Sequence, residues 1–379
     1  TNVKELDPDE IERDARKKLG TARSLFHQFK DKYPRPAEVA DIIIKDLDIF
    51  IKKIPIMRIV STEGLEQRHF DKISGILGTE FKIDEKTTFS KIDKIRGMLQ
   101  EKQEELDEIA QAAAREYSNL KMLQKMEKDW EGICFELKHL PEVGTYILIG
   151  SSVELIETLL EEQTLTTQTM KGSPFAKVHE KRIEVWDEWL TRSASILDVW
   201  KKVQTLWSGL EPVFASADIQ KQLYKEAAIF KEVDAQWHKT MDQVHRNTAV
   251  RTVTEIEGLL ETLKYCHEKL EIVQRELNNY LEKKRLFFPR FFFLSNEELL
   301  SILKETKDPT RVQPHLKKCF EGIKSLEFEE RKITAMISQE GEKVDLVRVI
   351  DTDQAEGAVE RWLIEVEDCM IKSTREVIF

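Results

Sequence analysis

Few residues of this chain have the types and spacing that chemistry requires. His315 and Cys319 stand at i and i+4, so one helix face would present both to a metal ion. Two ligands do not make a site, and no second pair lies at a fitting spacing. Residues 144–151 come nearest to a phosphate-binding loop, but they lack its lysine and hold one residue too many. We therefore expect no catalytic residue, no cofactor and no metal, and we predict a short β-strand at 145–150.

Four of the seven tryptophans recur on faces of expected helices: Trp186, Trp200, Trp207 and Trp237. Such a stripe could line a ligand groove, but at helical spacing it more often packs a core. The acidic run at 101–108 is most simply a solvated helix face. No serine has the pattern of a nucleophile elbow. These observations favour a protein that is not itself an enzyme.

The composition restricts the partners. Lysine and arginine total 59 against 70 aspartates and glutamates, which gives a net charge of −11. A chain this acidic has no general electrostatic footprint for nucleic acid. An acidic polymer surface such as a microtubule would also repel it, so we expect no direct contact with either.

Other features of the sequence indicate where the chain works. No apolar run approaches the roughly 18 residues of a membrane span, so we expect no membrane contact. The N-terminal residues form neither a signal peptide nor a transit sequence, and the start at Thr1 suggests a fragment of something longer. The four cysteines are widely spaced without a C-x-x-C, which indicates a reducing compartment. We expect a soluble cytoplasmic protein.

Hydrophobic periodicity predicts a mainly α chain. Apolar residues at spacings of three and four mark helices at about 1–33, 37–54, 87–139, 152–162, 175–210, 218–244, 250–284 and 355–374, with a polar loop ending at 171–174. At about 1.5 Å per residue the 250–284 helix would span roughly 50 Å, longer than a compact domain needs. Short breaks between the three long helices allow antiparallel neighbours, so an elongated helical bundle is expected.

An aromatic segment follows that bundle. Pro289 should end the preceding helix near Phe288, because proline lacks an N–H and disfavours a helical residue before it. Three consecutive aromatics and a leucine cannot share one helix face, so we predict a short buried strand or extended segment. The segment is a candidate junction and hinge where stiff helix meets non-helical chain. Its residues are Phe288, Pro289, Arg290, Phe291, Phe292, Phe293 and Leu294.

The residues around this segment add three expectations. Arg290 needs a partner, and we favour an internal salt bridge over a contact with another domain. Ser295 and Glu298 have capping-box spacing at the start of the next helix. A further helix should begin at Pro314 and run through Ile323.

The hydrophobic period changes to two after residue 332. We predict a β-hairpin over 332–350 that turns at Glu340 and Gly341, with a β-bulge where the phase slips at Val347. The charged tip, Glu340 with Gly341 and Glu342, would project from a helical body. A contact with a neighbouring domain and an ordinary surface hairpin are equally compatible with this pattern.

Three stretches resemble the linker of dynein heavy chains, particularly axonemal ones of the inner-arm type. They are YLEKKRLFFPRFFFLSNEELLSIL at 280–303, TKDPTRVQPHLKKCFEGI at 306–323 and MKGSPF at 170–175. The resemblance covers about residue 54 to the end. Phe70 departs from it, because the family usually has tryptophan there. The chain departs again at Leu223, which the family commonly follows with proline.

The resemblance implies an elongated arch of consecutive helical bundles with a small β-hairpin and short extended segments. It implies a mechanical linker whose bending and straightening across the AAA+ ring of the same heavy chain drives a microtubule motor. Dynein subunits would bind through the tail, and the protein would lie in the axoneme of a cilium or flagellum. The expected parts are tail-proximal helices (1–53), an N-terminal subdomain (54–174), a long-helix bundle (175–288) and a C-terminal subdomain with the hairpin (289–379).

Two other classes of function stay open at this stage. A static helical scaffold or tethering rod of a large cytoskeletal protein would show the same stiff helices. An enzymatic fragment finds no constellation of residues to carry it. The hairpin tip is the candidate contact with the ring under the linker hypothesis.

Overall fold

The computed structural model of the chain describes residues 3–84, 87–304, 308–355 and 357–378. These residues are mainly helical, which confirms the predicted fold class. The chain divides into two compact units, one of residues 1–131 and 161–190 and the other of residues 132–160 and 191–379. No described helix has the length and apolar character that crossing a membrane requires. The four parts expected from the resemblance stay a prediction.

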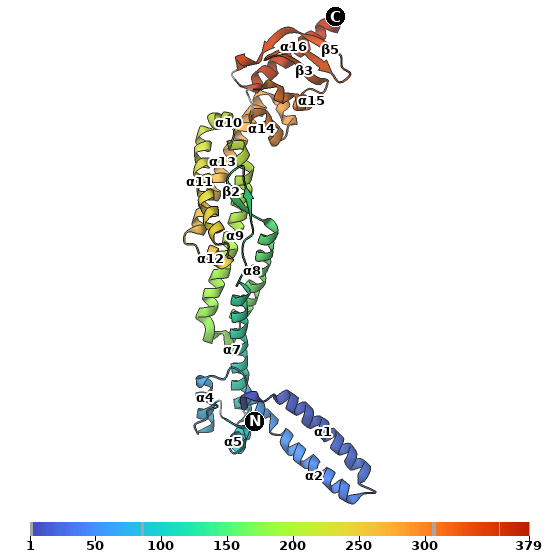
Figure 1. Cartoon of the computed structure of the whole chain (residues 1–379), viewed down its shortest axis with the longest axis vertical. Coiled ribbons are helices and arrows are strands. Elements are labelled where there is room, and N and C mark those ends of the chain that lie inside the picture. Colours follow the sequence, from blue (N-terminus) through green and yellow to red (C-terminus); the bar gives the residue numbers. More distant parts are fainter. Residues whose placement is uncertain (1–2, 85–86, 305–307, 356, 379) are drawn as a thin grey trace. The chain divides into compact units, whose positions relative to one another are not determined.

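The first unit is helical. Its elements are η1 (Val3–Glu5), α1 (Pro8–Phe29), α2 (Pro34–Ile51), α3 (Ile54–Ser61), α4 (Gln67–Leu77), α5 (Phe89–Asp93), α6 (Arg96–Glu101), α7 (Gln103–Asp129), η2 (Pro174–His179) and parts of α8 (Gly150–Lys171) and α9 (Glu180–Phe214). Helices α1 and α2 pack side by side as a hairpin (Figure 1). Asp7 begins α1 by accepting the backbone N–H groups of Asp9 and Glu10, each at 3.0 Å.

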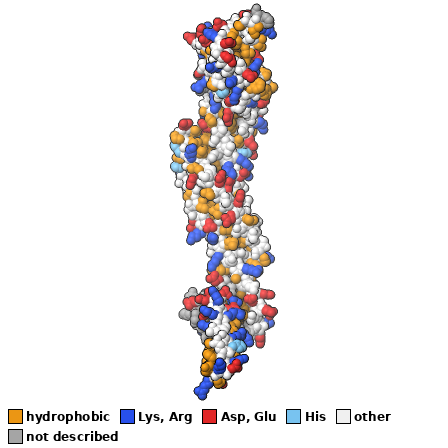
Figure 2. All heavy atoms as spheres, turned by 90° about the vertical axis from the view of Figure 1, so that its right-hand side faces the viewer, with side chains coloured by type: hydrophobic (Ala, Val, Ile, Leu, Met, Phe, Trp, Pro, Cys, Tyr) orange, Lys and Arg blue, Asp and Glu red, His pale blue; other side chains and the backbone are white. Residues whose placement is uncertain are grey.

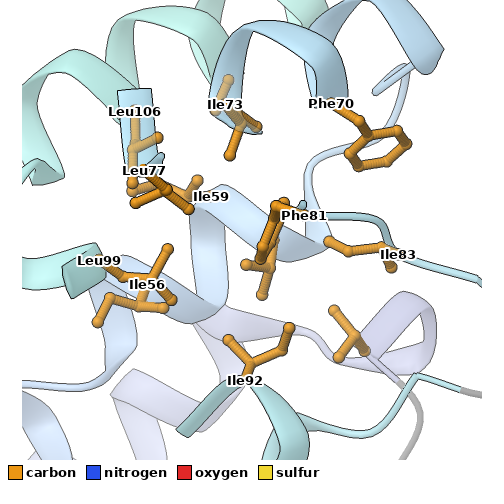
Figure 3. Close-up of a cluster of buried hydrophobic side chains, with 13 residues drawn as sticks. Ile56, Ile59, Phe70, Ile73, Leu77, Phe81, Ile83, Ile92, Leu99 and Leu106 are labelled. Carbon is orange, nitrogen blue, oxygen red and sulfur yellow. The ribbon is translucent and has the colours of Figure 1, made fainter. Parts of the chain in front are cut away.

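The core of the first unit gathers apolar side chains from η1, α3, α4, α6 and α7 (Figure 3). Burying each such side chain contributes roughly 1.5–3 kcal/mol. His69 is buried beside them. Its Nδ1 accepts the backbone N–H of Glu66 at 3.0 Å and its Nε2 lies 3.1 Å from Glu116 Oε2, so the ring completes a reciprocal cap of α4.

The second unit combines helices with two small sheets. It holds β1 (Leu137–Leu140), β2 (Thr145–Leu148), α10 (Ala217–Gln222), α11 (Tyr224–Arg246), α12 (Val250–Thr254), α13 (Leu259–Phe287), η3 (Pro289–Phe293), α14 (Asn296–Lys304), η4 (Pro309–His315), α15 (Leu316–Cys319), β3 (Ile323–Glu329), β4 (Lys332–Ser338), β5 (Lys343–Asp351), η5 (Thr352–Ala355), α16 (Val359–Ile378) and the rest of α8 and α9. Helix α11 packs along α13, and the rings of Trp207 and Trp237 stack at 5.2 Å.

Strand β2 confirms the strand predicted at 145–150. It pairs antiparallel with β1, so that Leu148 faces Leu137. Gln204 on α9 holds its end: Oε1 accepts the N–H of Leu148 at 2.8 Å, and Nε2 donates to the Leu148 carbonyl at 3.0 Å. The Gln204 side chain thus makes the two main-chain hydrogen bonds that a neighbouring strand would otherwise make with Leu148.

The predicted hairpin over 332–350 is confirmed as β4 and β5, within an antiparallel sheet of order β3-β4-β5. The register slips between the pairs Ala335–Asp345 and Ile333–Ile350, where the bulge was predicted. Inside this bulge the N–H of Val347 donates to Ser373 Oγ of α16 at 2.9 Å. Helix α16 therefore binds β5 where β4 does not.

Three boundary predictions were wrong because local breakers or buried polar groups outweigh periodicity. The nearly continuous helix predicted over 87–139 is divided into α5, α6 and α7 and ends at Asp129, since Gly132 takes a positive φ of 86° and β1 follows. The polar stretch expected as a loop continues α8 to Lys171, where Gln163, Thr167 and Met170 are buried at helical spacing and Gln163 Oε1 accepts the Trp130 indole N–H at 2.8 Å. The helix expected through Ile323 stops at Cys319, and Ile323 begins β3.

The second and third long helices are each interrupted. Leu223, at φ −118° and ψ 54°, separates α10 from α11 at the position where the sequence departs from the family pattern. Gly258, at φ 74°, precedes α13. Helix α13 therefore has 29 residues and is shorter than the helix predicted over 250–284, because residues 250–254 form the separate helix α12.

Gly64 and Gly75 provide a matched test of the first unit. Gly64 has φ +91°, and an added Cβ would overlap the Tyr117 side chain and lie 2.8 Å from the Ala113 carbonyl oxygen. Gly64→Ala should lower the free energy of unfolding by about 2 kcal/mol or more. Gly75 lies inside α4 with open space around it, so Gly75→Ala should raise stability by about 0.5–1 kcal/mol. Urea unfolding followed by circular dichroism measures both, and equal effects would contradict the strain at Gly64.

Candidate functional site

The aromatic junction, residues 288–294, begins where α13 ends. Phe288 leaves the helix at φ −124° and ψ 94°, and its N–H still donates to the Lys284 carbonyl at 3.0 Å. Pro289 then opens η3, because it needs no N–H partner and its fixed φ suits a first turn. The prediction that the helix ends near Phe288 is confirmed.

The predicted extended conformation of 291–294 is wrong. Residues 289–293 form a 3₁₀ helix, in which side chains three apart share a face. Phe288 and Phe291 are fully buried and Leu294 is 3% exposed, whereas Phe292 and Phe293 are 54% and 68% exposed. A buried strand would have enclosed all three consecutive rings. A period of three buries one ring of the three.

The buried rings form the packing of the junction. Phe288 meets Phe291 edge-on, with ring centroids 5.0 Å apart at 87°, and lies 6.1 Å from Phe320. Such edge-to-face pairs contribute about 0.5–1.5 kcal/mol beyond area burial. The cluster joins the end of α13 to η3 and to the residue that follows α15.

Arg290 makes the internal salt bridge that we favoured. Its Nε donates to Glu367 Oε1 on α16 at 2.9 Å, and Nη1 donates to the Cys319 carbonyl at 2.8 Å. Its guanidinium lies 4.8 Å from the centre of the Phe320 ring, at cation–π distance. One half-buried side chain therefore connects η3, the end of α15 and α16.

Three further contacts fix the chain on either side of the junction. Lys284 forms an ion pair with Glu360, the buried acid at the start of α16. Arg285 Nη2 donates to the Leu294 carbonyl at 3.0 Å. The capping box is confirmed: the Glu298 N–H donates to Ser295 Oγ at 3.2 Å, and the Ser295 N–H to Glu298 Oε2 at 3.0 Å.

The hairpin tip lies between β4 and β5. Glu340, Gly341 and Glu342 are exposed, and Gly341 takes φ 88°. Ser338 Oγ accepts the N–H groups of Glu340 and Glu342, each at 3.2 Å, so the turn is held by its own side chain. Figure 2 shows acidic and basic side chains interspersed on the face in view, without a surface of one sign.

The other residues that the sequence singles out for possible chemistry lie in hydrogen bonds or in the packed interior. His315 Nε2 lies 3.1 Å from Ser301 Oγ, and Cys319 is buried. Trp200, Trp207 and Trp237 are buried in the second unit, and Trp186 in the first. Among the residues that the structure describes, no three histidine, cysteine or acidic side chains gather as metal ligands would.

The comparison with protein families decides the identity of the chain. The family described as "Dynein heavy chain, N-terminal region 2" matches residues 1–379. The chain belongs to this family. This confirms the resemblance drawn from the sequence.

Several curated relatives of this dynein chain are axonemal heavy chains. It is 47% identical to "Dynein axonemal heavy chain 12" of Homo sapiens over 315 residues, which cover 83% of this chain and 10% of that protein. It is 43% identical to "Dynein axonemal heavy chain 3" of Mus musculus over 347 residues, 91% of this chain and 8% of that protein. It is 37% identical to "Dynein axonemal heavy chain 1" of Mus musculus over 374 residues, 98% of this chain and 9% of that protein. The chain thus spans about a tenth of the length of these relatives.

Sequence reasoning missed the partners of the junction. Glu367 and Phe320 both contact Arg290, and nothing in the local sequence pairs them with it. The spacing of three between Phe288, Phe291 and Leu294 was the available signal for the 3₁₀ turn.

The junction predicts opposite outcomes for two adjacent phenylalanines. Phe291→Ala should lower the free energy of unfolding by about 3–5 kcal/mol, because it removes a fully buried ring. Phe292→Ala should change it by no more than about 0.5 kcal/mol, because that ring is mostly exposed. Urea denaturation of both variants gives the comparison, and a large loss for Phe292→Ala would refute the 3₁₀ arrangement.

The cysteines predict a second contrast. Burial raises the pKa of the Cys266 and Cys319 thiols from 9.0 to about 11. Their thiolate fraction at pH 8 is then roughly 100-fold lower than normal, so iodoacetamide should label exposed Cys134 at least about 100-fold faster. Since these pKa values are raised on folding, their contribution to stability is complete below pH 9 and is lost as the pH rises towards 11. Equal labelling rates, measured by peptide mass spectrometry, would contradict the burial.

Proposed function

We propose that this chain is the mechanical linker of an axonemal dynein heavy chain. It performs no reaction. ATP binding and hydrolysis in the AAA+ ring of the same heavy chain bend and straighten it, and this movement drives the motor along microtubules. In this proposal the protein works in the axoneme of a cilium or flagellum, and dynein subunits bind through the tail. Family membership and the axonemal names of the relatives support it.

The observation that carries the proposal is the aromatic junction. Helix α13 runs for 29 residues and ends abruptly at a 3₁₀ turn that is packed by Phe288 and Phe291. A lever needs stiff segments and a defined place at which the chain changes direction. We assign the hinge to residues 288–294. The four-part division at 53/54, 174/175 and 288/289 belongs to the same proposal.

The contact with the ring is assigned to the hairpin tip. Glu340 and Glu342 are exposed on a turn that Ser338 holds in place. Two carboxylates on a rigid turn suit a basic surface, where each surface ion pair contributes up to about 1 kcal/mol. The tip would therefore guide the encounter with the ring more than it would hold the two together.

One observation favours a static rod as the second candidate. The Lys284–Glu360 pair connects the end of α13 to α16, and the Arg290–Glu367 pair connects the junction to α16. Bending at 288–294 would have to break or carry along both pairs. A scaffold that never bends would keep them permanently.

Distance measurements on the full heavy chain separate these candidates. A donor dye on Gln339→Cys, an exposed position beside the tip, is paired with an acceptor in the AAA+ ring, in a background with Cys134→Ser. A lever should give two single-molecule FRET populations whose ratio depends on the nucleotide. A static rod should give one. Phe291→Ala should also slow microtubule gliding several-fold while the ring still binds ATP, and unchanged gliding would count against the hinge.

A further inference from the structure

The motif at 170–175 contains the one serine or threonine of the chain that precedes a proline. Of the ten prolines, only Pro174 follows such a residue, Ser173. A proline has no backbone N–H and restricts the residue before it to extended backbone. Ser173 accordingly lies at φ −82° and ψ 135°. Serine followed by proline is the recognition element of proline-directed protein kinases, which accept a residue without an N–H after the serine.

The Ser173 hydroxyl is accessible for modification. The serine is partly exposed, and Lys171, Gly172 and Pro174 beside it are exposed. Its Oγ accepts the Phe175 N–H at 3.3 Å, which uses one of its two lone pairs and leaves the other for bond formation. The hydroxyl can therefore react while the turn between α8 and α9 stays folded.

Ser173 lines a hollow of about 310 Å³ in the first unit. Lys171 and Lys177, which precede and follow it in the chain, line the same hollow. A phosphate on the serine would add three acceptor oxygens and a charge of about −1.5 to −2 at pH 7. The hollow has the volume of about ten waters at ~30 Å³ each, so this group fits, and the two ammonium groups supply charge-assisted partners. Glu180 and Glu184 also line the hollow and would repel the phosphate, so the lysines decide where it lies.

Lys171 already has a partner with which the phosphate would compete. Its Nζ donates to Asp187 Oδ2 at 2.6 Å, and Gln168 Nε2 donates to Asp187 Oδ1 at 2.8 Å, so two side chains of α8 hold one carboxylate of α9. The hydrogen bond to Asp187 raises the pKa of Lys171, which stays charged. A phosphate two residues away in the chain attracts this ammonium more strongly than a single carboxylate does, because it carries more charge. Phosphorylation would therefore draw Lys171 from Asp187 and leave Gln168 as its remaining contact with α8 of these two.

We propose that Ser173 is a phosphorylation site of a proline-directed serine/threonine kinase, and that the hollow holds the phosphate between Lys171 and Lys177. In the reaction Ser173 Oγ bonds to the γ-phosphorus of ATP, the bridging P–O bond breaks, ADP leaves, and the hydroxyl proton passes to a carboxylate of the kinase. The phosphate then loosens the Asp187 contact between α8 and α9. This modification is separate from the proposed linker movement and does not require it.

Phosphorylation of the full-length heavy chain in vitro tests the site. The heavy chain is first treated with phosphatase and then incubated with ATP and a purified mitogen-activated protein kinase, and the occupancy of each peptide is followed by mass spectrometry. Ser173 should be labelled, and Pro174→Ala should lower its rate at least about tenfold. Ser295 provides the internal control, because it is an exposed serine at the start of α14 that asparagine follows. It should be labelled at least about tenfold more slowly than Ser173.

A peptide of residues 166–180 separates recognition from access. The peptide should be labelled at a rate within about tenfold of that of the heavy chain. Labelling of the peptide without labelling of the heavy chain would overturn the proposal, because the folded turn would then shield the hydroxyl. Absence of label from both, or equal labelling of Ser173 and Ser295, would also overturn it. Ser173→Ala, which keeps Pro174, should remove the label from this peptide alone.

The rate of dephosphorylation shows whether the lysines hold the phosphate. When the phosphorylated heavy chain is treated with a broad-specificity phosphatase, Lys177→Met should raise the rate about threefold, because a phosphate held by fewer charges is more available. Lys181→Met changes an exposed lysine of α9 outside the lining of the hollow, and it should leave the rate unchanged. Equal rates for Lys177→Met and the unsubstituted chain would overturn the placement of the phosphate.

The distance measurements on the linker are independent of this result. Two FRET populations together with an unlabelled Ser173 would retain the lever and reject the phosphorylation site. A labelled Ser173 with a single FRET population would do the reverse.

Discussion

The second unit depends on a proline that cannot donate a hydrogen bond. Because Pro289 has no N–H, the α-helical ladder of α13 stops and the chain continues with three residues per turn. That change of period selects Phe288, Phe291 and Leu294 for the interior. A continued α-helix would have distributed the same aromatics around its circumference. The missing N–H of Pro289 therefore leads to a segment with one buried face and one exposed face.

The two ion pairs around the junction fix the positions of the neighbouring elements more than they add to the free energy of unfolding. Arg290 and Glu367 are each about one third exposed, so their attraction is screened and contributes modestly. Glu360 is buried, and removing Lys284 would leave its charge without compensation, at a cost of several kcal/mol. The two pairs differ in what they do. One orients η3 against α16, and the other connects the start of α16 to the end of α13.

The sequence was sufficient for the elements that local chemistry specifies and insufficient for those that distant residues specify. The capping box at Ser295, the bulge near Val347 and the strand at β2 depend on neighbouring residues, and all were predicted. Gln163 on α8 is buried against Trp130 of another segment, and the chain after α15 enters a strand that pairs with β4. No periodicity contains that information. At the junction, Pro289 correctly predicts the end of the helix, whereas burial of the rings follows their spacing of three and not their consecutive order.

The bulge in β5 has a consequence for how the small sheet meets other molecules. An edge strand with a regular row of free N–H and carbonyl groups invites another chain to add a strand. In β5 the N–H of Val347 is already taken by Ser373, and the local twist departs from a regular ladder. Self-assembly through main-chain pairing is discouraged along this edge. A strand that paired along β5 would have to accommodate this interruption at Val347, so main-chain hydrogen bonds alone would hold it less well than on a regular edge.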